Sequence, residues 1–149
     1  MPDKKQIQRV LAFDFGAQKI GVAFGQSLSA SASPLTPLKS RDGVPDWHQI
    51  EKLIEQWQPD LFVVGIPYNM DGSDNEITVR ARKFMRRLHG RFGKPSHGMD
   101  ERLSSRAARE LLEQKGDNRT SLDSMAATLI LESWFNRQTP SSLKGEHSL

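Results

Sequence analysis

The segment "VLAFDFGAQKIGVAFG", residues 10–25, constrains the fold more than any other part of the sequence. Two apolar runs flank the short polar turn "AQK", a pattern that predicts two antiparallel strands joined as a hairpin. Residues 10–13 are apolar in succession, as in a central strand that is buried on both faces. Asp14 interrupts this run, and an ionised carboxylate in such surroundings requires a cation or several hydrogen-bond donors to compensate its charge.

The rest of the chain continues as alternating strand and helix patterns. The expected elements are an extended segment within 29–39, a helix over 46–58, a buried parallel strand in "PDLFVVGIP", a helix from a Ser73–Glu76 capping box to about Gly93, a weak strand in "KPSHGMDE", and helices over about 103–115 and 122–137. This order predicts an α/β fold with a five-stranded mixed sheet. Three strands form an antiparallel meander, two more run parallel, and helices flank the sheet. Residues 1–138 form one domain, and 139–149 form a flexible tail.

The composition excludes several classes of protein. The sequence has 149 residues, enough for one domain with a core, and contains no cysteine, so it has neither disulfides nor a thiolate zinc site. No apolar run approaches the roughly 20 residues needed to cross a bilayer. A hydrophobic fraction of 36% and a charged fraction of 26% are typical of a soluble protein, and we expect a cytoplasmic one without a membrane partner.

Basic residues are concentrated in one segment. Residues 80–109 contain ten basic and two acidic residues, a charge of +8 against +3 for the whole chain. Such a block is the pattern expected of a surface that binds a polyanion. A solvated helix face explains one basic helix about equally well.

Acidic residues occur at three places where strands end or helices begin. Asp14 lies near the end of the first strand, Asp100 and Glu101 follow the last expected strand, and Asp123 lies in the first turn of the final helix. In open α/β sheets, active sites form beyond the carboxyl ends of the parallel strands. Three converging carboxylates repel one another unless a cation lies among them. Oxygen ligands without cysteine or clustered histidine suit Mg²⁺ or Mn²⁺, and two such ions promote displacement at a phosphodiester.

Each acid also has a structural explanation. Asp14 can accept hydrogen bonds from a tight turn, Asp100 or Glu101 can pair with Arg102, and Asp123 suits the N-terminus of a helix. The residues by themselves leave both interpretations open.

Four motifs in order carry a family resemblance. The segments "DFGAQKIGVAFG", "VVGIPYNMDGS", "DERLSS" and "LDSMAATLILESWF" resemble the YqgF family, also called RuvX-like, of the RNase H superfamily. The resemblance covers about residues 10–137. It implies an RNase H-like fold with a five-stranded mixed sheet, in agreement with the order of elements above.

The resemblance also implies roles for individual residues. Asp14, Glu101 and Asp123 would be catalytic residues and ligands of Mg²⁺ or Mn²⁺, with Asp100 as the alternative to Glu101. The residues expected to contact nucleic acid are Lys19, Asn69, Arg80, Arg82, Arg86, Arg102 and Arg106. The arginines would hold phosphates without reading sequence.

The family is described as nucleases of the 5′ end of precursor 16S rRNA and as homologues of Holliday-junction resolvases. The leading hypothesis is therefore a metal-dependent nuclease that matures precursor 16S rRNA, as a monomer or weak homodimer. One alternative is a resolvase of four-way DNA, and another is a non-catalytic RNA-binding assembly factor. The preference for RNA over DNA rests on the resemblance alone.

Overall fold

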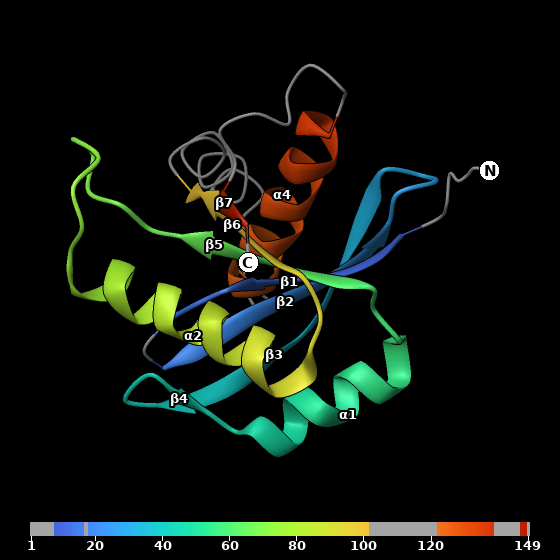
Figure 1. The fold of residues 1–149 in the computed structure, drawn as a ribbon, viewed down its shortest axis with the longest axis horizontal. Coiled ribbons are helices and arrows are strands. Elements are labelled where there is room, and N and C mark those ends of the chain that lie inside the picture. Colours follow the sequence, from blue (N-terminus) through green and yellow to red (C-terminus); the bar gives the residue numbers. More distant parts are fainter. Residues whose placement is uncertain (1–7, 17, 102–121, 139–146, 149) are drawn as a thin grey trace.

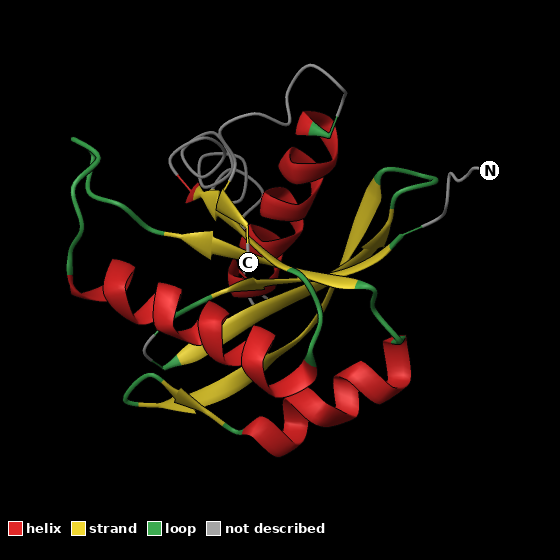
Figure 2. Ribbon diagram, in the orientation of Figure 1, coloured by secondary structure: helices red, strands yellow, loops and turns green. Residues whose placement is uncertain are grey.

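The polypeptide forms one sheet with helices on both faces. The computed structural model describes residues 8–16, 18–101, 122–138 and 147–148. Within these ranges, seven strands form the sheet in the order β4-β3-β2-β1-β5-β6-β7 (Figure 1). Helix α4 covers one face, and helices α1 and α2 cover the other (Figure 2).

The elements follow the expected order closely. Their bounds are β1 Arg9–Asp14, β2 Lys19–Gln26, β3 Ser31–Arg41, β4 Val44–Pro45, α1 Trp47–Trp57, β5 Leu61–Ile66, α2 Glu76–Phe92, β6 Ser96–Asp100, α4 Leu122–Arg137 and β7 His147–Ser148. Strands β1, β2 and β3 form the expected antiparallel meander, and β1, β5 and β6 run parallel. The predicted α/β fold with a mixed sheet is confirmed.

Two short strands correct the predicted number of five. β4 pairs with Ser40 and Arg41 at the end of β3, and β7 pairs with β6. Each has only two residues, too few to show the alternation that identifies a strand in a sequence. β7 falls within the predicted flexible tail, whereas 139–146 and 149 lie outside the described residues.

The start of α2 corrects a second expectation. The capping box is not Ser73–Glu76, because Asn75 is the N-cap and accepts a hydrogen bond from the Thr78 amide. The Thr78 hydroxyl in turn accepts one from the Asn75 amide. Ser73 instead bonds to Asp71 in the preceding loop. Both serine and asparagine are good N-caps, so composition alone did not separate the two positions.

Other expectations fall outside what the structure describes. The helix expected over 103–115 lies outside the described residues, whereas the helix expected over 122–137 is confirmed as α4. Among the helices of the described ranges, none is long and apolar enough to span a membrane.

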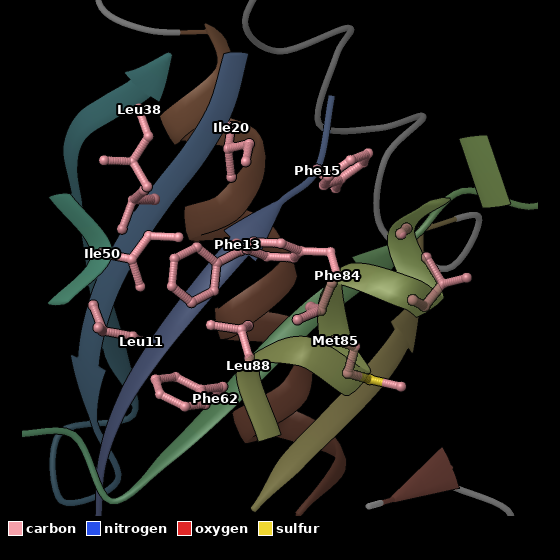
Figure 3. Close-up of a cluster of buried hydrophobic side chains, with 14 of the residues drawn as sticks. Leu11, Phe13, Phe15, Ile20, Leu38, Ile50, Phe62, Phe84, Met85 and Leu88 are labelled. Carbon is pink, nitrogen blue, oxygen red and sulfur yellow. The ribbon is translucent and has the colours of Figure 1, made fainter. Parts of the chain in front are cut away.

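The core has two layers. The larger cluster lies between the sheet and helices α1 and α2, and its strand residues include Leu11, Phe13 and Phe62 (Figure 3). The second cluster packs Val10 and Ala12 of β1 against α4. Successive residues of β1 therefore point to opposite layers, as expected for a strand buried on both faces.

Ser124 joins the start of α4 to an irregularity in the sheet. The pairing of β2 with β3 shifts between Ile20 and Val22, which interrupts the regular ladder. The buried Ser124 hydroxyl accepts a hydrogen bond from the Val22 amide at 3.2 Å and donates one to the Leu35 carbonyl at 2.5 Å. One side chain thus satisfies two backbone groups that the shift leaves available, and it fixes the first turn of α4 against the sheet.

We expect Ser124→Ala to destabilise the protein by about 1–3 kcal/mol, because it leaves a buried amide and carbonyl without their partner. Chemical denaturation monitored by circular dichroism would measure this free energy of unfolding. The matched control is Thr128→Ala, which removes a buried hydroxyl whose one hydrogen bond to a described residue goes to the Ser124 carbonyl one turn earlier. Equal losses in the two variants would contradict the role assigned to Ser124.

Candidate active site

Asp14 lies at the carboxyl end of β1, on the face of the sheet that carries α4. The alternation of β1 places it in phase with Val10 and Ala12, which pack against α4. Phe13, in the opposite phase, packs in the cluster under α1 and α2. Asp14 is partly buried, so its carboxylate is at the boundary between the core and solvent.

Glu101 follows the end of β6 and folds over the neighbouring strand. Its side chain is only 7% exposed. A Cβ atom added to Gly65 of β5 would lie 2.8 Å from Glu101 Oε2 and 3.0 Å from its Cγ. It would also lie 2.5 Å from the Cδ1 atom of Ile130 in α4. The missing side chain of Gly65 is therefore what leaves room for the carboxylate between the sheet and α4.

The sheet register brings these two acids to one location. Asp14 of β1 is the direct partner of Gly65 in the parallel pairing with β5. Adjacent strands lie about 4.8 Å apart. Asp14 thus stands beside Gly65, and the Glu101 carboxylate lies over Gly65 on the same face.

Asp100 belongs to the opposite face. A Cβ added to Gly98 would contact Ile66 and Met85, which belong to the layer under α2. Asp100 is in phase with Gly98 along β6, whereas Met99 packs on the α4 side. Of the two consecutive acids, Glu101 is the one that shares a face with Asp14.

The third predicted acid, Asp123, is placed only by its backbone. It lies in the first turn of α4, one and two turns before Ala127 and Ile130, which are buried against the sheet. Its side chain is outside the described part of the structure, as are Arg102 and Arg106. Among the residues whose side chains are described, no group of three histidines or carboxylates gathers around one point.

The described acids fit a divalent cation. Glu101 Oε2 is buried and has no hydrogen-bond partner among the described residues. A buried carboxylate oxygen without a partner is costly, and a cation is the partner that best offsets its charge. Carboxylate oxygens are the ligands preferred by Mg²⁺ and Mn²⁺.

The loop between β5 and α2 extends beyond the sheet and is held by its own side chains (Figure 1). Asn69 Nδ2 donates to Ser73 Oγ at 2.9 Å and to the Asp74 carbonyl at 3.3 Å. Asn69 Oδ1 accepts from Asn75 Nδ2 at 2.8 Å. Both ends of the Asn69 amide are thus used to shape the loop, an arrangement the sequence did not indicate.

Arg82 fixes this loop to α2. Its guanidinium donates two hydrogen bonds to the Asp74 carboxylate, at 2.8 and 2.7 Å, and lies 5.5 Å from the centre of the Tyr68 ring. The hydrogen bond from Arg82 lowers the pKa of Asp74. Hydrogen bonds to Asp74 and to Tyr68 raise the pKa of Arg82 above its usual value. Arg82, expected at a phosphate, is here engaged within the protein.

The remaining described basic residues lie at the surface. Lys19 is exposed at the start of β2, and Arg86 is exposed on α2. Arg80 Nη2 pairs with Glu76 at 3.2 Å one turn earlier on α2. Their predicted contacts with nucleic acid remain predictions.

Sequence reasoning missed Gly65. The signal was present, because a glycine in the middle of the apolar run "LFVVGI" marks a place where another group approaches the backbone closely. Gly65 has no functional group of its own, so a search for catalytic or metal-binding side chains does not identify it.

Comparison with known proteins gives close relatives in sequence. The chain is 53% identical over 133 residues to the "Putative pre-16S rRNA nuclease" of Aeromonas salmonicida, covering 87% of this chain and 95% of the relative. It is 54% identical over 134 residues to the protein of the same name from Chromohalobacter salexigens, covering 87% of this chain and 90% of the relative.

The fold is shared with solved structures at much lower identity. A structure of Thermus thermophilus RuvC in complex with a Holliday junction substrate matches with a TM-score of 0.57 at 15% identity. The match covers 95% of this chain and 99% of that one. The sequence model described as "RuvX: Holliday junction resolvase" matches residues 8–137. This match and the close relatives confirm the resemblance in the motifs, and the chain belongs to the RuvX family.

Proposed function

We propose that this protein is a metal-dependent nuclease that matures the 5′ end of precursor 16S rRNA in the cytoplasm. One observation carries the proposal: Asp14 and the buried Glu101 carboxylate flank Gly65 on one face of the sheet, and Glu101 Oε2 lacks a hydrogen-bond partner among the described residues. The names of the close relatives supply the substrate, and the match to the family supports the class of reaction.

Three acids would hold the metal. We assign Asp14, Glu101 and Asp123 as the ligands of Mg²⁺ or Mn²⁺ and as the catalytic residues. Bound there, the cations would offset the carboxylates and stabilise the charge that develops on the oxygens of a phosphodiester during hydrolysis. The burial of Glu101 keeps its carboxylate in one orientation, which suits a ligand that must not rearrange during the reaction.

The basic residues predicted to contact nucleic acid would position the substrate. Arg80, Arg86 and Lys19 are at the surface, and Arg102 and Arg106 follow Glu101 in the sequence. Contacts of such side chains with phosphates give affinity and register without reading bases. Arg82 and Asn69 would act indirectly, because they maintain the shape of the loop beside α2.

A second candidate substrate is a four-way DNA junction. The description of the family model and the likeness to RuvC favour it. A resolvase must cut two strands symmetrically and therefore acts as a dimer, whereas an rRNA nuclease can act as a monomer. Light scattering coupled to gel filtration separates a monomer or weak homodimer from a stable dimer. A non-catalytic RNA-binding assembly factor is the third possibility.

We expect the wild-type protein to cleave a precursor 16S rRNA 5′ leader with Mg²⁺ or Mn²⁺, and Asp14→Asn to reduce the rate at least about 100-fold. Loss of one charged ligand removes several kcal/mol of transition-state stabilisation, and 1.36 kcal/mol corresponds to tenfold in rate. Cleavage of the RNA leader and of a four-way DNA junction would be followed on gels.

Circular dichroism of both proteins is the control for folding. Cleavage of the junction but not of the leader would replace the RNA substrate by DNA. Binding without cleavage of either substrate, in either metal, would contradict the nuclease and favour the assembly factor.

Gly65→Ala tests whether the site depends on the space over β5. The added Cβ would collide with the Glu101 carboxylate and with Ile130. We expect a loss of about 1–3 kcal/mol in stability from overpacking and a loss of more than about tenfold in cleavage, because Glu101 must move. Unfolding and cleavage would be measured on the same preparation, together with the increase in melting temperature caused by Mn²⁺.

The matched control is Gly90→Ala on α2, where an added Cβ would meet no heavy atom of the described residues within 4 Å. This variant should keep full cleavage and gain about 0.5–1 kcal/mol from the higher helix propensity of alanine. Wild-type cleavage and wild-type Mn²⁺ stabilisation in Gly65→Ala would show that the position of Glu101 is not needed.

A further inference from the structure

A basic cavity lies on the other face of the sheet, behind the candidate active site. Its volume is about 270 Å³, and it opens between the hairpin that joins β3 to β4, the start of α1 and the side of α2. The residues that line it are Asp42, Gly43, Val44, Pro45, Trp47, Arg80, Lys83, Phe84 and Arg87. Of these residues, the function proposed above uses only Arg80.

Three cations of the lining come from one face of α2. Arg80, Lys83 and Arg87 are three and four residues apart, the spacing that aligns side chains along one side of a helix. Asp42 is the one acid of the lining. Arg80 is paired with Glu76, whereas neither Lys83 nor Arg87 has an ion pair with any residue in the described ranges. The cavity therefore has an excess of positive charge.

The position of the cavity ties it to the candidate active site. Phe15 directly follows Asp14 and points to the opposite face, where it packs on Phe84 with ring centres 5.3 Å apart (Figure 3). A Cβ added to Gly43 would lie 3.6 Å from the Phe15 ring and 3.2 Å from Arg80 Nη1. Asp14, the last residue of β1, thus faces the candidate active site, and the next residue, Phe15, packs against Phe84 of the cavity lining. The two sites lie on opposite faces of the sheet at the end of β1.

The turn between β1 and β2 is hydrogen-bonded to the end of β3. The Ser40 amide donates to the Gln18 carbonyl at 2.9 Å, and its hydroxyl donates to the Gly16 carbonyl at 3.1 Å. These bonds fasten the end of β3 to the β1–β2 turn. A polymer that crosses the edge of the sheet at this turn would therefore reach the acids on one face and the cations on the other.

The aromatic residues of the lining do not form a platform for bases. One face of the Trp47 ring stacks with Phe84, and the Arg91 guanidinium lies 4.3 Å from the centre of the same ring. Trp47 Nε1 is buried without a hydrogen-bond partner among the described residues. The cations of the lining, with both rings engaged inside the protein, match a phosphate group better than a base.

We propose that this cavity binds a backbone phosphate of the nucleic-acid strand that enters or leaves the candidate active site. The proposal rests on the nuclease function proposed above and adds Lys83 and Arg87 as substrate-binding residues. Like charges one turn apart on a helix are unfavourable, so this cluster has an energetic cost that a bound anion would offset. Because the contact is to a phosphate, it contributes affinity without sequence preference.

Lys83→Gln tests the proposal in the Asp14→Asn background, where binding is measured without cleavage. The matched control is Lys52→Gln, which removes one exposed lysine from a cavity of about 260 Å³ between β3 and α1 on the same face of the sheet. The probe is a fluorescently labelled single strand of the precursor 16S rRNA leader. Fluorescence anisotropy would give Kd over a series of salt concentrations, with EDTA present.

We expect Lys83→Gln to weaken binding roughly fivefold to tenfold near 0.1 M salt and to reduce the slope of log K against log salt by about 1, the effect of losing one phosphate contact. Lys52→Gln should change Kd less than about twofold. Arg87→Gln should repeat the effect of Lys83→Gln. The melting temperature of Lys83→Gln should be equal to or higher than that of its parent, which a purely structural lysine would not allow.

Two results would overturn the proposal. Equal Kd values for Lys83→Gln and Lys52→Gln would reduce the cavity to general surface charge, even if the nuclease activity itself were established. Stabilisation by millimolar inorganic phosphate that Lys83→Gln abolishes, without any change in RNA binding, would identify a site for free phosphate. RNA binding that depends on Lys83 in a protein without cleavage activity would keep the phosphate contact and remove only the nuclease.

Discussion

The burial of the Glu101 carboxylate against the backbone of β5 is the interaction on which the candidate site depends. A carboxylate that is 7% exposed is unfavourable unless its charge is offset. The sheet does not offer a side chain for this purpose, because the residue beneath it is Gly65. It offers space, bounded by Ile130 of α4, beside Asp14 of β1. The electrostatic cost is therefore concentrated at one point, and the cation proposed to bind there would offset it.

The topology of the sheet explains why the acids meet. Parallel pairing of β1, β5 and β6 brings their carboxyl ends to one edge, so residues far apart in the sequence become neighbours there. Helix α4 is fixed to the same region by Ser124, which bonds to β2 and β3 where their ladder is interrupted. The residue before Ser124 is Asp123. The hydrogen bonds of Ser124 therefore also fix the backbone of Asp123, and the irregular pairing of β2 with β3 helps to position this acid.

The periodicity of the sequence predicted the long strands and helices, but it did not predict features that depend on one or two residues. The hairpin, the buried strand β5 and the amphipathic helices α1 and α2 have many residues in phase, and their positions followed from the sequence. The two-residue strands β4 and β7 have no period, and the cap of α2 depended on which of two suitable residues the loop leaves free. The resemblance favoured Glu101, but which of the two acids shares a face with Asp14 required the structure, because the phase of β6 and the fold-back over Gly65 decide it. The same limit applied to Arg82, whose partner Asp74 lies in the irregular loop that precedes α2.

A nuclease must both bind a phosphate backbone and cleave it, and at the end of β1 the residues proposed for these two tasks lie on opposite faces of the sheet. Acids repel a polyanion, so a site built of carboxylates gains little affinity for a phosphate backbone before cations are bound. Lysine or arginine side chains placed among the acids would pair with them, and neither group would then be available to bind a metal ion or a phosphate. Alternation along the chain avoids this conflict, because Asp14 at the end of β1 faces α4, while the next residue, Phe15, packs on the opposite face against Phe84 of the cavity that Lys83 and Arg87 line. The sheet separates the acids on one face from the basic residues on the other. A nucleic-acid strand that crosses the edge of the sheet would contact the basic cavity and the proposed active site in turn.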